Sequence, residues 1–136
     1  MSVAEAFIDA SVLFYLLSND ARKAYRVDQL LAERGTISVQ VLNEFAAVAL
    51  RKTDVALRDV KVILDTVRAV CTVEPLTVAA HNRGVEVCER YKFAFYDSLI
   101  IASALIVGST VLYTEDLQHG QIIERQLRVA NPFVTH

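Results

Sequence analysis

Four acidic residues in this chain have unusually apolar neighbours, and each could bind a metal ion or transfer a proton. Asp9 lies in FIDASVLF, Glu44 in VLNEFAAVAL and Asp97 in FAFYDSLIIA. Asp116 follows the segment TVLYTE. An ionised carboxylate buried without a partner is costly, so each position needs a local reason. Taken singly, a helix cap, a solvated helix face or a polar loop would explain each acid.

Taken together, the four acids predict a metal site. Two carboxylates about 5 Å apart repel by roughly 3 kcal/mol at an effective dielectric near 20. Four acids in one crevice therefore need a cation or raised pKa values. No arginine or lysine is adjacent to any of them in the sequence. Oxygen-only ligands suit Mg²⁺ or Mn²⁺, and one or two such ions can activate a water and stabilise the leaving oxygen of a phosphodiester.

Short strands that alternate with helices must position these acids. Asp9 directly follows a predicted strand at residues 6–8, and Asp116 comes just after residues 110–114, the clearest strand pattern in the chain. Further strands are predicted at residues 36–38 and 71–76. Strands separated by helices favour a parallel sheet with helices on both faces, in which sites form beyond the carboxyl ends of the strands. Asp9 and Asp116 are expected at that edge.

Helical patterns fill the intervals between these strands. Ser38 is expected to cap a helix at residues 39–52 that buries Val41, Phe45 and Val48, and Gly35 to end the preceding helix. The other predicted helices are one at 12–17, one from Asn19 or Asp20 to about Arg34, one opening at Thr53 or Asp54, one at 77–91 with Val78, Val85 and Cys88 facing inward, and one that follows Asp97 and stops at Gly108.

Length and composition indicate a single domain over residues 1–136. The 136 residues are 54% hydrophobic, with a mean hydropathy of +0.34, which suffices for a sizeable core. The apolar stretch at 99–107 is far shorter than the roughly 20 residues that span a bilayer. The N-terminal stretch has no basic region typical of a signal peptide, so we expect a cytoplasmic protein. Cys71 and Cys88 lack metal-binding spacing, so neither zinc nor a disulfide is expected.

The charge balance gives no clear indication of the partner. A net charge of −2 and a pI near 5.9 count against nucleic acid. Without the four acids, however, the net charge would rise from −2 to +2. Three basic clusters could then contact a phosphate backbone, although solvated helix faces explain them equally well. They are Arg22, Lys23 and Arg26; Arg51 and Lys52; and Arg90 with Lys92.

Four segments carry a resemblance to a known family. FIDASVLFYLL, SVQVLNEF, FAFYDSLIIASAL and LYTEDLQHGQIIERQLRVANPF follow one another in this order along essentially the whole chain. In these segments the chain resembles the PIN-domain ribonucleases, and among them the VapC-type toxins of bacterial and archaeal toxin–antitoxin pairs. The resemblance implies a three-layer α/β/α fold with a short central parallel sheet of four to five strands.

The resemblance also assigns roles to the acids. By position, Asp9, Glu44, Asp97 and Asp116 match the family's acidic metal-binding residues. Asp9, Asp97 and Asp116 are expected to hold Mg²⁺ or Mn²⁺, and Glu44 to bind a second ion or orient the water. Thr114 matches a hydroxyl residue that supports the site.

Several nearby residues keep more than one interpretation. Glu115 is an acid beside the site, an alternative ligand or a solvated loop residue. Ser11 lines the site or caps a helix, and Ser98 caps or packs. His119 orders its loop or touches substrate or antitoxin. Phe95 and Tyr96 are expected to pack in the core, with stacking on a base as the alternative.

The implied activity is hydrolysis of RNA by a metal-activated water. The resemblance further implies a homodimer, and inhibition by a small antitoxin whose tail enters the acidic groove. A PIN nuclease of RNA maturation is the alternative within the family. A receiver-like magnesium-binding signalling module is the alternative outside it, but that class needs paired acids at the first strand and a late lysine. Here Asp9 stands alone after the strand, and no lysine follows Lys92.

Overall fold

A short six-stranded sheet lies between two groups of helices in this computed structural model, which describes residues 6–134. The strands are β1 (Ala6–Ile8), β2 (Thr36–Ser38), β3 (Thr72–Glu74), β4 (Val111–Tyr113), β5 (Ile122–Ile123) and β6 (Leu127–Ala130). The helices are α1 (Ala10–Leu13), the 3₁₀ helix η2 (Phe14–Leu17), α2 (Ala21–Ala32), α3 (Val39–Lys52), α4 (Leu57–Val70), α5 (Val78–Tyr91) and α6 (Phe95–Ile106).

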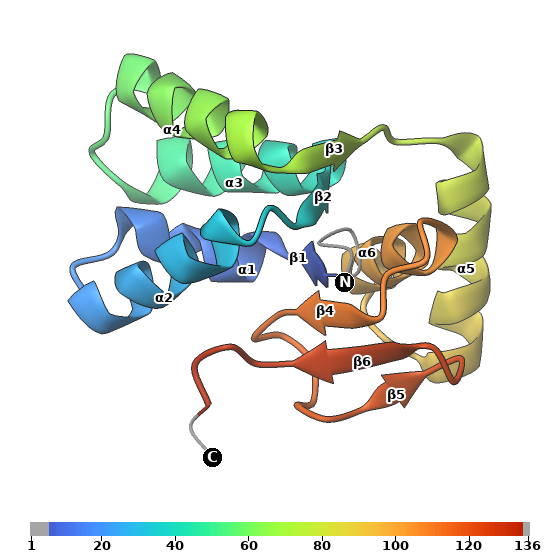
Figure 1. The fold of residues 1–136 in the computed structure, drawn as a ribbon. Helices are drawn as coiled ribbons and strands as arrows, with labels where there is room; N and C mark the ends of the chain where they lie inside the picture. The colour runs from blue at the N-terminus through green and yellow to red at the C-terminus, as the bar shows by residue number, and fades with distance from the viewer. Residues whose placement is uncertain (1–5, 135–136) are drawn as a thin grey trace.

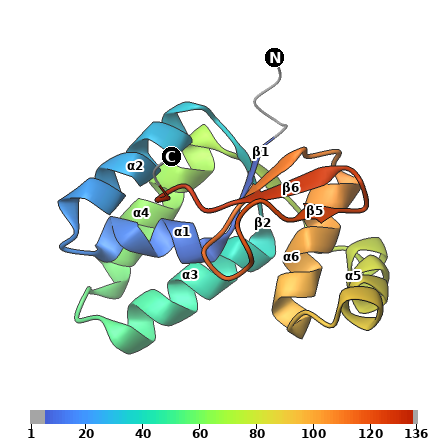
Figure 2. The same cartoon turned by 90° about the horizontal axis from the view of Figure 1, so that it is seen from below.

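The layers confirm the expected α/β/α fold. The strand order is β3-β2-β1-β4-β6-β5, and all neighbouring pairs are parallel except β5 and β6. Helices α1 to α4 lie on one side of the sheet, and α5 and α6 on the other (Figures 1 and 2). The central strands contribute the fully buried side chains Phe7, Ile37, Leu112 and Val129. Burial on both faces explains why most residues of these strands are apolar.

The sheet is wider than the expected four to five strands because the chain ends in a β5–β6 hairpin. Ile122 pairs with Arg128 and Ile123 with Leu127 in antiparallel register. The turn between them places Glu124 and Arg125 in the left-handed region, with φ of 53° and 58°. Such turns usually contain glycine or asparagine, and neither occurs here, so the sequence carries no hairpin signal.

Side-chain caps begin three of the long helices at or near the predicted positions. Asp20 accepts a hydrogen bond from the Lys23 amide at the start of α2, and Ser38 accepts one from the Val41 amide at the start of α3. Thr77 caps α5 in the same way. Each oxygen satisfies an amide that the first helical turn leaves unpaired. The bounds of α3 are those predicted.

Several helix bounds differ from the predicted ones. The helix predicted at 12–17 is the short helix α1 followed by η2, and α6 begins before Asp97 rather than after it. Helix α4 begins at Leu57 rather than at Thr53 or Asp54, because the Thr53 hydroxyl donates to the Ala49 carbonyl and accepts from the Val55 amide, which keeps this segment in the turn after α3. Helix α2 ends at Ala32 rather than near Arg34, since Arg34 instead of Gly35 adopts the left-handed conformation that ends the helix, with φ of 57°.

The buried face of α5 also differs from the prediction. Val78 and Val85 are exposed and Cys88 is only half-buried, whereas Ala80, Gly84 and Val87 are buried. Helix α5 packs closely on α6 through these small residues, and a Cβ atom at Gly84 would lie 2.4 Å from Leu99 Cδ2. The larger residues therefore point away from the contact.

No helix within residues 6–134 is long and apolar enough to cross a membrane.

Candidate active site

The carboxyl ends of β1 and β4 meet at the candidate site. The two strands pair in parallel with Ile8 opposite Tyr113, so Asp9 and Thr114 leave the sheet side by side. The Asp9 amide donates to the Tyr113 carbonyl at 3.0 Å, and the Thr114 Oγ1 hydroxyl donates to Asp9 Oδ2 at 2.9 Å. Both side chains are buried, with exposed fractions of 4% and 1%.

Two hydroxyl groups fix Asp9 and the loop after β4. Ser11 Oγ donates to Asp9 Oδ2 at 2.9 Å and accepts from the Glu115 amide at 3.1 Å. Thr114 Oγ1 in turn accepts from the Asp116 amide at 3.1 Å. The Ala10 amide donates to Asp9 Oδ1 at 2.8 Å, so Asp9 is also the N-cap of α1. Capping and site formation thus coincide at Asp9, and Ser11 lines the site.

Glu44 reaches the site from the second turn of α3 and is held by Gln40. Gln40 Nε2 donates to Glu44 Oε1 at 2.8 Å and to the Tyr96 carbonyl at 3.2 Å, which links α3 to the start of α6. Gln40 was not among the residues predicted from the sequence. Its position four residues before Glu44 on the same helix face was the available signal.

Asp97 lies in the first turn of α6 without capping the helix. Ala94 occupies the N-cap position and provides no side-chain cap, and α6 begins two residues before Asp97. The capping explanation is therefore wrong for Asp97. The first turn of α6 positions its carboxylate, but the carboxylate does not cap the helix. Ser98 packs in the way expected, with its hydroxyl donating to the Ala94 carbonyl at 3.0 Å.

Three of the acids have raised pKa values, partly because of one another. Burial raises the pKa of Asp97 to about 6, and the other three acids add to the rise. Burial also raises the pKa of Glu44. The hydrogen bond from Gln40 lowers this pKa, whereas the charges of Asp9 and Asp116 raise it further. The pKa of Asp116 is raised by burial first and by Asp9 second. The structure thus brings the four predicted acids into one electrostatic neighbourhood.

The site suits a hard divalent cation in donor type and in charge. Its side chains offer carboxylate and hydroxyl oxygens, as Mg²⁺ and Mn²⁺ prefer. Gln40 Oε1 is buried and has no hydrogen-bond partner within residues 6–134, so it could accept from a metal-bound water. In the same part of the chain, however, no three Asp, Glu, His or Cys side chains already converge on one ion. The positive charge of a bound ion would offset the repulsion between the carboxylates, which could then move closer together.

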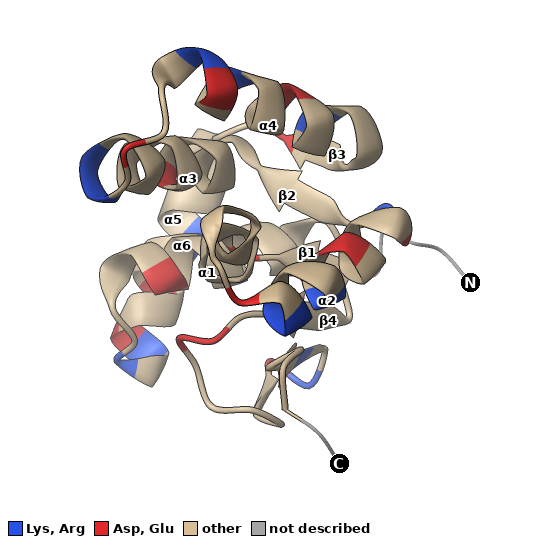
Figure 3. Ribbon diagram, turned by 90° about the vertical axis from the view of Figure 1, so that its left-hand side faces the viewer, with Lys and Arg blue, Asp and Glu red and all other residues tan. Residues whose placement is uncertain are grey.

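Glu115 is held by a lysine and a tyrosine on the side of α2. Tyr15 Oη donates to Glu115 Oε1 at 2.7 Å, and Lys23 Nζ lies 3.5 Å from Glu115 Oε2. Lys23 also donates to Tyr15 Oη at 3.1 Å. In Figure 3 the acidic loop after β4 lies close to the basic start of α2. Glu115 is therefore an ion-paired acid beside the site. The sequence offered no signal for the partners Tyr15 and Lys23.

The remaining candidates around the site make contacts of their own. His119 Nδ1 accepts from the Asn131 amide at 2.9 Å, which ties its loop to the C-terminal segment. Phe95 and Tyr96 contact each other, with ring centroids 5.7 Å apart, but they are exposed rather than packed in the core.

An acidic edge on a short parallel α/β/α sheet is the arrangement of the PIN domain, and the comparisons agree. The model of the PIN domain family matches residues 6–123. The chain therefore belongs to the PIN-domain family, as its sequence motifs predicted. Comparison with curated proteins finds no match.

Solved structures of a toxin and of toxin–antitoxin complexes share the fold. VapC20 of Mycobacterium tuberculosis, a sarcin-ricin loop cleaving toxin, is 24% identical with a TM-score of 0.67, over 82% of this chain and 89% of that one. A toxin–antitoxin complex from Klebsiella pneumoniae is 17% identical with a TM-score of 0.71, over 94% and 98%. VapBC2 of Rickettsia felis, bound to a promoter DNA fragment, is 16% identical with a TM-score of 0.63, over 93% and 98%.

Proposed function

We propose that this chain is a metal-dependent endoribonuclease. The observation that carries the proposal is that Asp9, Glu44, Asp97 and Asp116 lie close enough to interact at the carboxyl ends of β1 and β4, so that burial and then the other three acids raise the pKa of Asp97. Clustering four carboxylates is unfavourable unless a cation neutralises them. Membership of the PIN family and the likeness to a toxin that cleaves an RNA loop support RNA as the substrate.

Each residue has a defined part in this mechanism. Asp9, Asp97 and Asp116 would hold Mg²⁺ or Mn²⁺, and Glu44 would bind a second ion or orient the attacking water. When bound, the metal supplies an activated water and neutralises charge on the scissile phosphate. Thr114 and Ser11 fix the Asp9 carboxylate through hydrogen bonds of 2.9 Å each. Gln40 fixes Glu44 in the same way.

The biological role that we propose is that of the toxin in a VapBC-type toxin–antitoxin pair, acting in the cytoplasm as a homodimer. Two of the similar structures are described as a toxin–antitoxin complex and as VapBC2, which supports a small antitoxin as the partner. Growth arrest on expression, relieved by a protein encoded next to it, would separate this role from RNA maturation. The family match leaves no support for the receiver-like alternative.

Cleavage of RNA by the purified chain tests the enzymatic proposal. Wild-type protein should cut RNA with Mg²⁺ or Mn²⁺ and stop on addition of EDTA. Asp97→Asn should fold normally and cut nothing, whereas Asp65→Asn, which changes an exposed acid on α4, should keep full activity. Cleavage that survives EDTA, or a fully active Asp97→Asn protein, would refute the assignment.

If no RNA is cut, a metal-binding measurement shows whether the protein fails to bind the metal or whether the RNA tested is not its substrate. Mn²⁺ should raise the melting temperature of the wild type and of Asp65→Asn, because it binds only the folded site. It should not raise that of Asp97→Asn.

A further inference from the structure

We propose that the groove between α2 and the C-terminal segment 128–134 holds the phosphate backbone of the RNA strand that flanks the cleaved bond. This inference rests on the proposed ribonuclease function. The groove has a volume of about 730 Å³ and lies between the first turns of α2 and the end of the chain that the structure describes. Its basic side chains are Arg22, Lys23, Arg26 and Arg128.

Most of the positive charge in this groove has no acidic partner. Within residues 6–134, Arg22, Arg26 and Arg128 form no ion pair within 4.0 Å. Asp20 is the acid that lines the groove, and its carboxylate is used to cap α2. Arg26 Nε donates to the Pro132 carbonyl at 3.0 Å, which holds its guanidinium across the groove. Phosphate oxygens would supply the missing negative charge.

Aromatic side chains lie among these arginines. Tyr25, on α2, lines the groove with 66% of its surface exposed, and Phe133 lines it from the C-terminal segment. An exposed ring next to a basic track is the combination by which proteins bind single-stranded nucleic acid, because bases stack on the ring while arginines contact the backbone. An acidic protein segment would use the arginines but not the ring.

Two contacts place the groove beside the candidate active site. Tyr113 lines the groove, and the next residue, Thr114, bonds to Asp9. Lys23 also lines the groove and pairs with Glu115, the neighbour of Asp116. A strand whose scissile phosphate lay at the acids could therefore place adjoining phosphates against the arginines.

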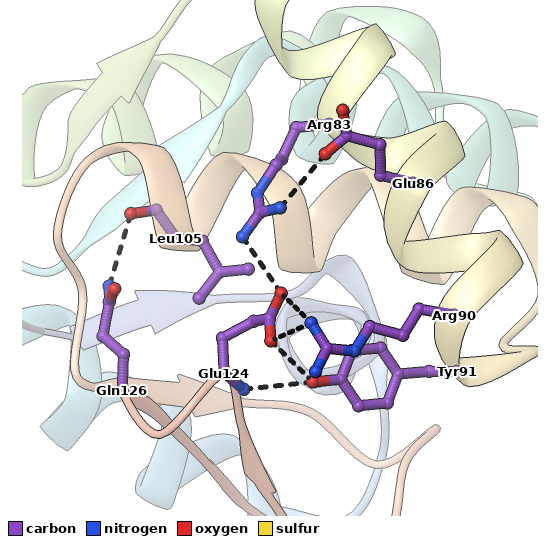
Figure 4. A network of polar contacts seen from close by, with 7 residues as sticks. All are labelled: Arg83, Glu86, Arg90, Tyr91, Leu105, Glu124 and Gln126. Carbon is purple, nitrogen blue, oxygen red and sulfur yellow. Dashed lines mark hydrogen bonds and ion pairs between the residues drawn. The ribbon is translucent and has the colours of Figure 1, made fainter.

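The other basic clusters are less suited to this task. Arg83 Nη2 and Arg90 Nη1 lie 3.2 and 3.0 Å from the carboxylate of Glu124, which also accepts from Tyr91 Oη (Figure 4). Their charge is therefore neutralised within the fold. Arg51 lines a second groove together with Glu44, but no other arginine or lysine within residues 6–134 lines that groove, so it offers no track of positive charge.

Binding of RNA under conditions without cleavage tests the proposal. Fluorescein-labelled single-stranded RNA of random sequence is titrated with the Asp97→Asn protein in EDTA. Adding Arg22→Gln and Arg128→Gln should weaken binding at least tenfold, and should reduce the slope of log K against log salt by about 1.4, at about 0.7 per lost phosphate contact. Tyr25→Ala should weaken binding about fivefold or more with little change in slope. The matched control is Arg58→Gln with Lys61→Gln, which removes the same charge from exposed positions on α4.

The outcomes separate the groove from the function. If the Arg22/Arg128 variant keeps the same affinity and slope, or if the α4 control loses as much affinity, the groove does not bind the RNA backbone. Metal-dependent cleavage by the wild type would still support the proposed function in that case. Arginine-dependent binding of labelled polyglutamate, with RNA binding unaffected, would assign the groove to an acidic protein segment and also overturn the proposal. If the wild type neither binds nor cleaves RNA, both the groove proposal and the proposed function would be refuted.

Discussion

Thr114 Oγ1 and Asp9 Oδ2 lie 2.9 Å apart and join residues that are 105 positions apart in the sequence. The contact connects the ends of two neighbouring parallel strands, β1 and β4. The same hydroxyl accepts from the Asp116 amide, so one side chain sets the positions of two of the proposed metal ligands.

Replacing Thr114 with valine keeps its shape and removes these bonds. The Asp9 carboxylate loses a donor and the Asp116 amide loses its acceptor, so unfolding free energy should fall by about 1–3 kcal/mol in urea titrations. Cleavage should fall by about ten- to a hundredfold, as when a residue that orients a metal ligand is lost. Thr114→Ser keeps the hydroxyl and should retain most activity. Wild-type cleavage by Thr114→Val would show that the hydroxyl does not position the site.

The metal-free protein should lose stability as the pH rises. The pKa of Asp97 is raised from 3.8 to about 6 on folding, so its contribution to stability is fully present below 3.8 and is lost as the pH rises through about 6. Asp97→Asn has no such group and should be the more stable protein above that interval, by about 1 kcal/mol, since half-exposure screens the effect. Thermal unfolding in EDTA across this pH range measures the difference. A gap between wild type and variant that does not widen with pH would contradict the argument.

The parts of the fold that the sequence predicted depend on local signals. Ser38 caps α3, and Gly108 ends α6 with a φ of 80°, because each acts on its own stretch of chain. The β5–β6 hairpin was missed because Glu124 and Arg125 adopt left-handed conformations that their types do not signal. The face of α5 was missed because its partner α6, rather than hydrophobicity, selects the residues that are buried.

The residues of the candidate site also include some that the sequence predicted and some that it did not. The acids were recognisable because each stands out within an apolar stretch of sequence. The partners of Glu115 were not, because Tyr15 and Lys23 reach it from about 100 and 92 positions away in the chain, and neither has an unusual sequence context.

Adjacent acids Glu115 and Asp116 should differ sharply in their importance for cleavage. Both Glu115 carboxylate oxygens face groups on η2 and α2, Tyr15 Oη at 2.7 Å and Lys23 Nζ at 3.5 Å, whereas the pKa of Asp116 is raised by burial and by Asp9. Asp116→Asn should therefore abolish Mn²⁺-dependent cleavage and the Mn²⁺-induced rise in melting temperature. Glu115→Gln should preserve both. Equal losses in the two variants would make Glu115 a metal ligand.

Gly84 should be intolerant of any side chain because it lets α5 approach α6. A Cβ atom there would lie 2.4 Å from Leu99 Cδ2 and 3.3 Å from Leu99 Cα, so Gly84→Ala must displace Leu99 or the helix. We expect a loss of about 1–3 kcal/mol in unfolding free energy, as for other overpacked contacts. Leu99 is two residues from Asp97, so the displacement should also lower cleavage.

A double-mutant cycle isolates this contact. Leu99→Ala alone leaves a cavity, but combined with Gly84→Ala it makes room for the new methyl group, so the double variant should be more stable than the sum of the single losses indicates. Urea titration of the four proteins gives the coupling energy. A coupling energy of zero would mean that the helices can move apart freely, and that α5 does not fix the first turn of α6 from which Asp97 extends.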